Sequence, residues 1–133
     1  MRDRICLTGL RAFGHHGVFE HERREGQLFV VDVVIEVDTR HAASTDELRD
    51  TVNYATLADR VVARVSGEAV NLLETLAAQI AEDALELVSE SASREGQATG
   101  GDKVVVEVTV HKPAAPLPHE FADVSVTIRR ESA

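Results

Sequence analysis

The chain has 133 residues, a formal net charge of −9 and a single cysteine, Cys6. This length suits one domain, and one cysteine excludes both an internal disulfide and a zinc cluster built on thiolates. The acidic charge argues against nucleic-acid binding, and the sequence shows neither a signal peptide nor an apolar stretch that could cross a membrane, so we expect a cytoplasmic protein without nucleic-acid or membrane partners.

Two strands are predicted in the first forty residues. Residues 5–12 alternate between apolar and polar but change parity at Gly9, which indicates a β-bulge. Residues 28–38 alternate more clearly, with apolar side chains on one face and acidic ones on the other. We expect an antiparallel hairpin whose long polar connection, residues 17–27, has a functional role. The charged run within it, residues 20–25, is interpreted by itself as a solvated loop.

Two amphipathic helices are predicted in the middle of the chain. The first has an apolar stripe over residues 57–65 and ends at Gly67, a suitable C-cap. The second has its stripe over residues 73–88. Residues 89–102 are small and polar, which predicts a mobile loop.

Two further strands, residues 104–110 and 124–128, close the chain. The order β-β-α-α-β-β predicts an α+β fold, a four-stranded antiparallel sheet with both helices on one face. The other face carries Val30, Val34 and Val105, and an open sheet has two unprotected edges. Subunits that join edge to edge into a multi-chain barrel would cover both features, whereas a monomer would leave a few surface valines.

Lys112 is the first candidate functional residue. It follows on the valine face of the strand 104–110, so the pleat directs its ammonium group towards the apolar side. All three prolines, Pro113, Pro116 and Pro118, come directly after it and end the strand. A lysine at the mouth of a core can serve as a general base, whereas a lysine that extends to the surface from a strand end would be structural.

Two further segments have a structural and a functional interpretation. Asn71 to Glu74 reads as a capping box, but a carboxylate in a first helical turn can also accept paired hydrogen bonds from an N–C–N edge. Thr51 or Asn53 can cap the first helix, with Tyr54 as a hydrophobic anchor. Alternatively, Tyr54 lies against a flat heterocycle and offers a phenolic proton.

The histidines do not predict a metal site. His15 and His16 are adjacent, so in an extended segment they point to opposite sides. His111 and His119 could add ligands, but their spacing matches no recognised pattern.

Five segments in chain order together resemble the dihydroneopterin aldolase family, pterin-cleaving enzymes of folate biosynthesis. They are residues 14–18 (GHHGV, followed by Glu22), 26–33 (GQLFVVDV), 50–54 (DTVNY), 71–77 (NLLETLA) and 112–118 (KPAAPLP). The resemblance implies a single domain over residues 1–133 with the tunnelling fold. It further implies a homo-octamer of two stacked four-subunit barrels, with active sites between subunits.

The resemblance also implies how a pterin substrate would be bound. Glu74, with the backbone at Leu73, would hold the amino-pyrimidine edge. Val52, Asn53 and Tyr54 would also bind the substrate, with Tyr54 supplied by a neighbouring subunit, stacked near the ring and active in proton transfer.

By the same resemblance, Lys112 would be the general acid/base, and Glu22 would contact the substrate's hydroxylated tail or orient Lys112. The reaction would cleave 7,8-dihydroneopterin into 6-hydroxymethyl-7,8-dihydropterin and glycolaldehyde. The ring's own C=N bond can accept the electrons of the broken C1′–C2′ bond, so neither a Schiff base, nor a metal, nor an organic cofactor is expected.

Some residues depart from the family pattern, and other functions stay open. His15 stands where the family usually has an aromatic residue, and Asn53 where His or Asp is more usual. One alternative is an epimerase acting on dihydroneopterin or its triphosphate, for which Arg23 and Arg24 could supply a basic cluster. The other is a ring protein that binds pterin without catalysis.

Overall fold

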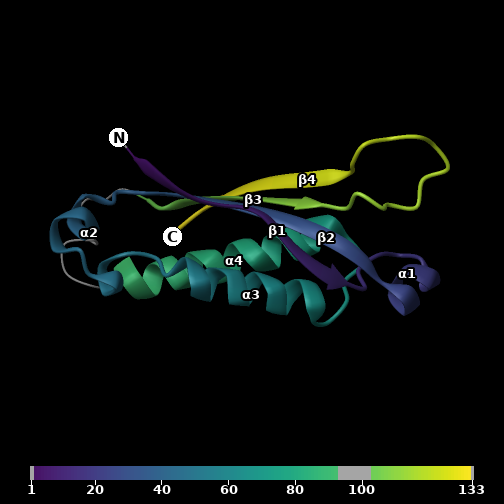
Figure 1. Cartoon of the computed structure of the whole chain (residues 1–133), viewed down its shortest axis with the longest axis horizontal. Coiled ribbons are helices and arrows are strands. Elements are labelled where there is room, and N and C mark those ends of the chain that lie inside the picture. The colour runs from purple at the N-terminus through teal and green to yellow at the C-terminus, as the bar shows by residue number, and fades with distance from the viewer. Residues whose placement is uncertain (1, 93–102, 133) are drawn as a thin grey trace.

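The computed structural model of the chain describes residues 2–92 and 103–132. One antiparallel sheet of four strands, in the order β1-β2-β3-β4, carries the long helices α3 and α4 on one face (Figure 1). The elements are β1 (Asp3–Gly14), α1 (Glu20–Glu25), β2 (Gln27–Val37), α2 (Arg40–Thr45), the 3-10 helix η1 (Leu48–Asp50), α3 (Tyr54–Ser66), α4 (Leu73–Ala92), β3 (Val105–His111) and β4 (Ser125–Glu131). The predicted α+β class and the order of the strands and long helices are confirmed. No helix in the described ranges has the length and hydrophobicity to cross a membrane.

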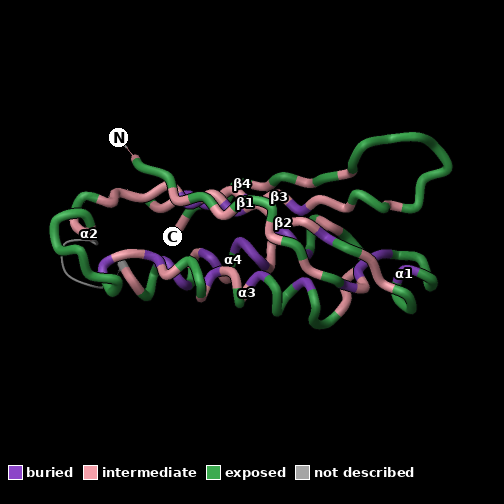
Figure 2. Tube along the Cα trace, viewed as in Figure 1, coloured by how far each residue is buried: buried purple, intermediate pink, exposed green. Residues whose placement is uncertain are grey.

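The core lies between the sheet and the two long helices (Figure 2). The central strands β2 and β3 supply alternate residues, as their period of two predicts, and the helices supply the stripes read from their period of 3.6. The fully buried side chains of the four elements include Phe29, Val31, Val33, Ile35, Leu57, Val61, Val65, Leu76, Ile80, Ala84, Val106, Val108 and Val110.

The bulge predicted in β1 is present at Gly9. The register of β1 against β2 shifts between Leu7 and Leu10. Gly9 has a φ of 73°, which favours glycine, and its amide donates to Asp32 Oδ1 at 2.7 Å. The bulge therefore keeps the apolar side chains of β1 on the core face on both sides of the register shift. Its amide hydrogen bond also joins β1 to a side chain of β2.

The ends of α3 also follow the prediction, whereas the start of α4 does not. Asn53 caps α3 by accepting from the amides of Ala55 and Thr56, and the helix ends at Gly67. Helix α4 begins at Leu73, so Asn71 lies too early to be its N-cap. The predicted capping box was wrong because the Asn71 side chain accepts a hydrogen bond from Arg23 instead.

Three other local interpretations need correction. The charged run is the short helix α1 rather than a solvated loop, and it buries one of its carboxylates. Helix α2 and the turn η1 were not predicted. Residues 89–92 continue α4 instead of forming a loop, while residues 93–102 of that predicted loop lie outside the described part of the chain.

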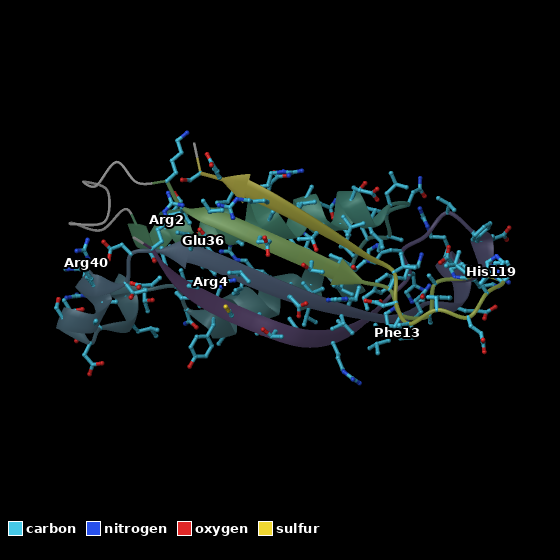
Figure 3. The ribbon with its side chains drawn as sticks, turned by 90° about the horizontal axis from the view of Figure 1, so that it is seen from above. Arg2, Arg4, Phe13, Glu36, Arg40 and His119 are labelled. Carbon is cyan, nitrogen blue, oxygen red and sulfur yellow. The ribbon has the colours of Figure 1, made fainter. Side chains whose placement is uncertain are left out.

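The face of the sheet away from the helices is largely polar. Val30 and Val34 are half-buried on this face and Val105 is buried. Around them, Glu36 pairs with Arg129 at 3.1 Å and with Arg2 at 3.9 Å (Figure 3). Strands β1 and β4 are the two edges of this sheet.

Candidate active site

The site is centred on an ion pair between Lys112 and Glu22. Lys112 directly follows β3, and its backbone amide donates to the carbonyl of Val124 at 2.7 Å. Its Nζ lies 2.6 Å from Glu22 Oε2, and the two side chains are 11% and 2% exposed. The ammonium group is therefore directed inward, as the strand pattern predicts, and the alternative of a surface lysine is wrong.

Glu22 is held by donors on several sides. It is the third residue of α1, and its Oε1 accepts from the amide of Phe19 at 3.3 Å, as in one half of a capping box. Its Oε2 also accepts from Gln27 Nε2 at 3.1 Å. Burial alone would raise the pKa of Glu22, but the hydrogen bonds from Lys112, the Phe19 amide and Gln27 hold it below its ordinary value of 4.5.

Gly17 allows the carboxylate to approach the backbone this closely. Gly17 has a φ of 150°, and a Cβ atom there would lie 2.2 Å from Glu22 Oε1. A side chain at this position would displace Glu22 from its donors.

Arg23 connects α1 to the start of α4. Its Nε donates to the carbonyl of Gly17 at 2.8 Å, and its guanidinium group also donates to Asn71 Oδ1. The Gly17 amide in turn donates to the carbonyl of Val70 at 3.0 Å. These contacts place the first turn of α4, with Leu73 and Glu74, at the same end of the molecule as Lys112 (Figure 1).

Glu74 is exposed in that first turn. Within the described ranges its side chain has no hydrogen-bond or ion-pair partner, so the carboxylate is available to a ligand. A carboxylate can accept two parallel N–H bonds from one planar group, which is the recognition that the sequence predicted for this residue.

The basic cluster considered for a triphosphate is already engaged. Arg23 binds Gly17 and Asn71, and Arg24 lies 3.6 Å from Glu20 and 3.7 Å from Glu25. Nothing in these contacts favours a triphosphorylated substrate.

His16 is a structural residue of the site that the sequence reasoning missed. It is 1% exposed, its Nε2 donates to the carbonyl of Val65 at 2.8 Å, and its Nδ1 accepts from the amide of Val70 at 3.0 Å. Burial lowers its pKa, so the ring is neutral with its proton on Nε2. The sequence analysis considered His16 only as a metal ligand and argued against that role, and residues 2–92 and 103–132 contain no group of three or more side chains suited to a metal.

Tyr54 does not join this group within one chain. It is the first residue of α3 and is 69% exposed, so it is not a hydrophobic anchor of its own subunit. The other end of α3, at Val65, contacts His16 beside the site. A helix of 13 residues spans about 20 Å, and this length separates Tyr54 from the site. Val52 packs into the core and Asn53 caps α3, so the whole 52–54 segment lies at the far end.

The arrangement thus combines two chemical abilities at one end of the chain. Lys112 with Glu22 can transfer a proton, and Glu74 can bind a planar nitrogen-containing edge. Of the residues that the sequence suggested, Glu22 and Lys112 are in contact, Leu73 and Glu74 lie at the same end of the chain, and Val52, Asn53 and Tyr54 lie at the other end.

Comparison with known proteins agrees with these observations. The family model described as dihydroneopterin aldolase matches residues 5–129. A dihydroneopterin aldolase of Streptomyces coelicolor is 51% identical over 96% of this chain and 97% of its own, and that of Bacillus subtilis is 35% identical over 98% and 99%.

Solved structures show the same architecture. The crystal structure of E. coli dihydroneopterin aldolase in complex with neopterin is 29% identical, with a TM-score of 0.74 over 96% of this chain and 98% of that one. A dihydroneopterin aldolase structure from Vibrio cholerae, 23% identical, has a TM-score of 0.80 over 99% of both chains and supports the fold. The tunnelling fold expected from the sequence motifs is confirmed for the single chain.

Proposed function

Because the chain belongs to the dihydroneopterin aldolase family, we propose that it cleaves 7,8-dihydroneopterin with Lys112 as the general acid/base. The products are 6-hydroxymethyl-7,8-dihydropterin and glycolaldehyde. The observation that carries the assignment of Lys112 is its 2.6 Å contact with the buried carboxylate of Glu22. An amine held in this way has a fixed position and can give or take a proton at a defined atom.

The cleavage needs one proton removed and one returned. A base accepts the proton of the hydroxyl on C2′, the C1′–C2′ bond breaks, and its electron pair moves into the C=N bond of the dihydropterin ring. Protonation at C1′ then gives the hydroxymethyl product, so protons and electrons balance without a Schiff base or an added cofactor. Glu22 stays ionised because its pKa is lowered, and it orients Lys112 for both transfers.

Glu74 supplies the recognition of the substrate in this proposal. Its carboxylate, with the backbone at Leu73, accepts the N–H groups of the amino-pyrimidine edge. The exposed position of Glu74 in the first turn of α4, on the same side as Lys112, supports this role. The neopterin complex of the E. coli relative supports a pterin as the ligand class.

A complete site requires a second subunit in this proposal. Tyr54, with Val52 and Asn53, comes from a neighbouring chain, and the subunits form barrels that stack into a homo-octamer. The helix-length separation of Tyr54 from Lys112 supports this arrangement. So do the two free edges of the sheet, β1 and β4, which can pair between subunits.

The test is to incubate the purified protein with 7,8-dihydroneopterin and to separate the pterins. We expect 6-hydroxymethyl-7,8-dihydropterin and glycolaldehyde in equal amounts. Lys112→Ala lowers kcat by roughly 10²–10⁴-fold, the range for general acid–base groups. Lys103→Ala is the matched control, since Lys103 is the only other lysine and its side chain is 58% exposed.

The same assay separates the alternatives. An epimer of the substrate beside the cleavage products would show epimerase activity at the same site. No conversion of dihydroneopterin, with the pterin still bound, would indicate a non-catalytic ring protein. A Lys112→Ala variant that keeps more than about a third of the wild-type kcat would overturn the role of Lys112.

A further inference from the structure

His111 bridges two carboxylates on the sheet face away from the helices. Its Nε2 lies 2.7 Å from Asp32 Oδ2 and its Nδ1 lies 2.6 Å from Asp123 Oδ2. An ionised carboxylate only accepts hydrogen bonds, so a ring that bonds both carboxylates must carry a proton on each nitrogen. The geometry is therefore that of an imidazolium between two anions.

The bridge reaches across most of the sheet. Asp32 also accepts from the amide of Gly9 in the bulge of β1 at 2.7 Å, so the chain of contacts runs from β1 through β2 and β3. At its other end, Asp123 lies just before β4. The strand register places Arg11 on this face from β1, across Val30, so Arg11 opposes the imidazolium while the two aspartates favour it.

The bridge closes the base of the segment from Lys112 to Val124, which we call the proline loop. This loop projects beyond the end of the sheet (Figures 1 and 3), and most of its residues are exposed (Figure 2). One backbone hydrogen bond joins its two ends, from Lys112 N to Val124 O. The His111–Asp123 contact flanks that bond and joins the ends a second time.

We propose that His111, held by Asp32 and Asp123, is a positioning residue that closes the base of the proline loop and so keeps Lys112 in contact with Glu22. This inference rests on the proposed function, in which Lys112 transfers the protons. His111 itself lies on the opposite face from the Lys112 side chain and acts only through the backbone that the two residues share.

The bridge should depend on pH. The hydrogen bonds to Asp123 and Asp32 raise the pKa of His111 above its ordinary value of 6.5, although burial opposes this. A histidine with a raised pKa contributes its stabilisation fully below the unfolded pKa, and that contribution is lost as the pH rises through the folded pKa. We expect the proline loop to be closed in mildly acidic solution and to loosen as the pH increases.

The experiment compares His111→Gln with His119→Gln in the assembled protein. His119 lies at the outer part of the same loop (Figure 3), is exposed, and has no partner among the described residues. The substitution His119→Gln therefore makes the same chemical change without breaking the bridge. Hydrogen exchange of the Lys112 and Ala115 amides, which donate to Val124 and Lys112, reports the base of the loop at pH 6, and kcat and KM report the Lys112 side chain. We expect at least tenfold faster exchange and at least fivefold lower kcat in His111→Gln, less than twofold change in KM, and wild-type values in His119→Gln.

A second variant, Asp123→Asn, keeps the inference testable if His111→Gln assembles poorly. This variant removes one anion from the bridge, so the pKa of His111 measured by NMR should be lower than in the wild type. Amide hydrogens of the proline loop should exchange faster. Wild-type loop exchange, or a wild-type kcat, in a folded His111→Gln protein would overturn the inference. A failure of the proposed role of Lys112 would appear differently, as full activity in Lys112→Ala, independently of the exchange rates in the loop.

Discussion

At the scale of single residues, the site depends on a carboxylate that stays charged inside the protein. Glu22 is 3% exposed, a burial that would favour its neutral form, but three donors surround it. Its lowered pKa means that the carboxylate stabilises the fold above its unfolded pKa, and this contribution is lost as the pH falls through the folded value. The loss of stability in acid solution therefore includes a contribution from this buried pair.

Glu74→Ala should act mainly on binding. The carboxylate is exposed and has no partner in the described residues, so its removal should change stability little but would delete two charged hydrogen bonds to the pterin. Each such bond is worth about 1.5–3 kcal/mol, so the affinity for 6-hydroxymethylpterin should fall at least roughly tenfold. Calorimetric titration measures this, with the neighbouring exposed Leu72→Ala as the control. Unchanged affinity would remove Glu74 from the binding site.

Lys112 could be predicted from the sequence because its orientation depends only on parity along one strand. The environment of Glu22 could not be predicted from the sequence. Its main partner is ninety residues away, and the charged run around it carries no apolar pattern that would indicate burial. Arg23 and Asn71 are 48 residues apart, so their contact was also hidden, which left the capping box as the only local interpretation of Asn71.

At the scale of elements, His16 holds the connection between α3 and α4 in place. It joins the last turn of α3, at Val65, to Val70, and the Gly17 amide adds a second bond to Val70. The first turn of α4 follows directly, so the buried imidazole of His16 contributes, together with the Gly17 and Arg23 contacts, to the position of the proposed pterin-binding carboxylate relative to Lys112.

His16→Ala should therefore destabilise the protein strongly. It leaves a buried carbonyl and a buried amide without partners and opens a cavity, which together cost about 2–5 kcal/mol. His15→Ala is the control, because the His15 ring makes a hydrogen bond to the carbonyl of Arg23 in an exposed setting and an edge-to-face contact with Phe13, but does not join α3 to Val70. Urea unfolding at matched protein concentration measures both. A small, equal loss in the two variants would show that His16 is not the connecting residue.

The two bridging histidines should respond to pH in opposite directions. Burial lowers the pKa of His16, so below about 6.5 the unfolded chain binds a proton that the folded chain does not, and stability falls with decreasing pH. His111 has the opposite effect on stability, because its pKa is raised.

The long strands and helices could be predicted from periodicity, whereas α1, with six residues and no apolar stripe, offers no such signal.

At the scale of the whole molecule, the expected site residues do not all lie at the same end of one chain. Helix α3 separates Tyr54 from the end that contains Lys112 and Glu22 (Figure 1). No pattern within the sequence predicts this separation, since it follows from the direction in which α3 runs under the sheet. The motif resemblance assigned Tyr54 and Lys112 to a shared pocket but to different subunits, and within one chain the two residues lie at opposite ends.

Mixing two inactive variants tests whether neighbouring chains complete the site. Rings reassembled from Lys112→Ala and Tyr54→Ala subunits contain some sites in which both residues are native, each from a different chain. Activity should reappear on mixing, provided that each variant alone is nearly inactive. Native mass spectrometry confirms the mixed rings. Mixed rings without recovered activity would mean that Tyr54 does not serve a neighbouring site.

The length of α3 also has a consequence for how the rate varies with the amount of protein. If the groups at its two ends serve different pockets, a lone chain has no complete pocket, and turnover per chain is set by the law of mass action. Specific activity then falls on dilution below the dissociation constant of the ring and recovers on concentration. In the proposed assembly, the quantity of protein in solution would set the rate, with no effector and no change in any single chain.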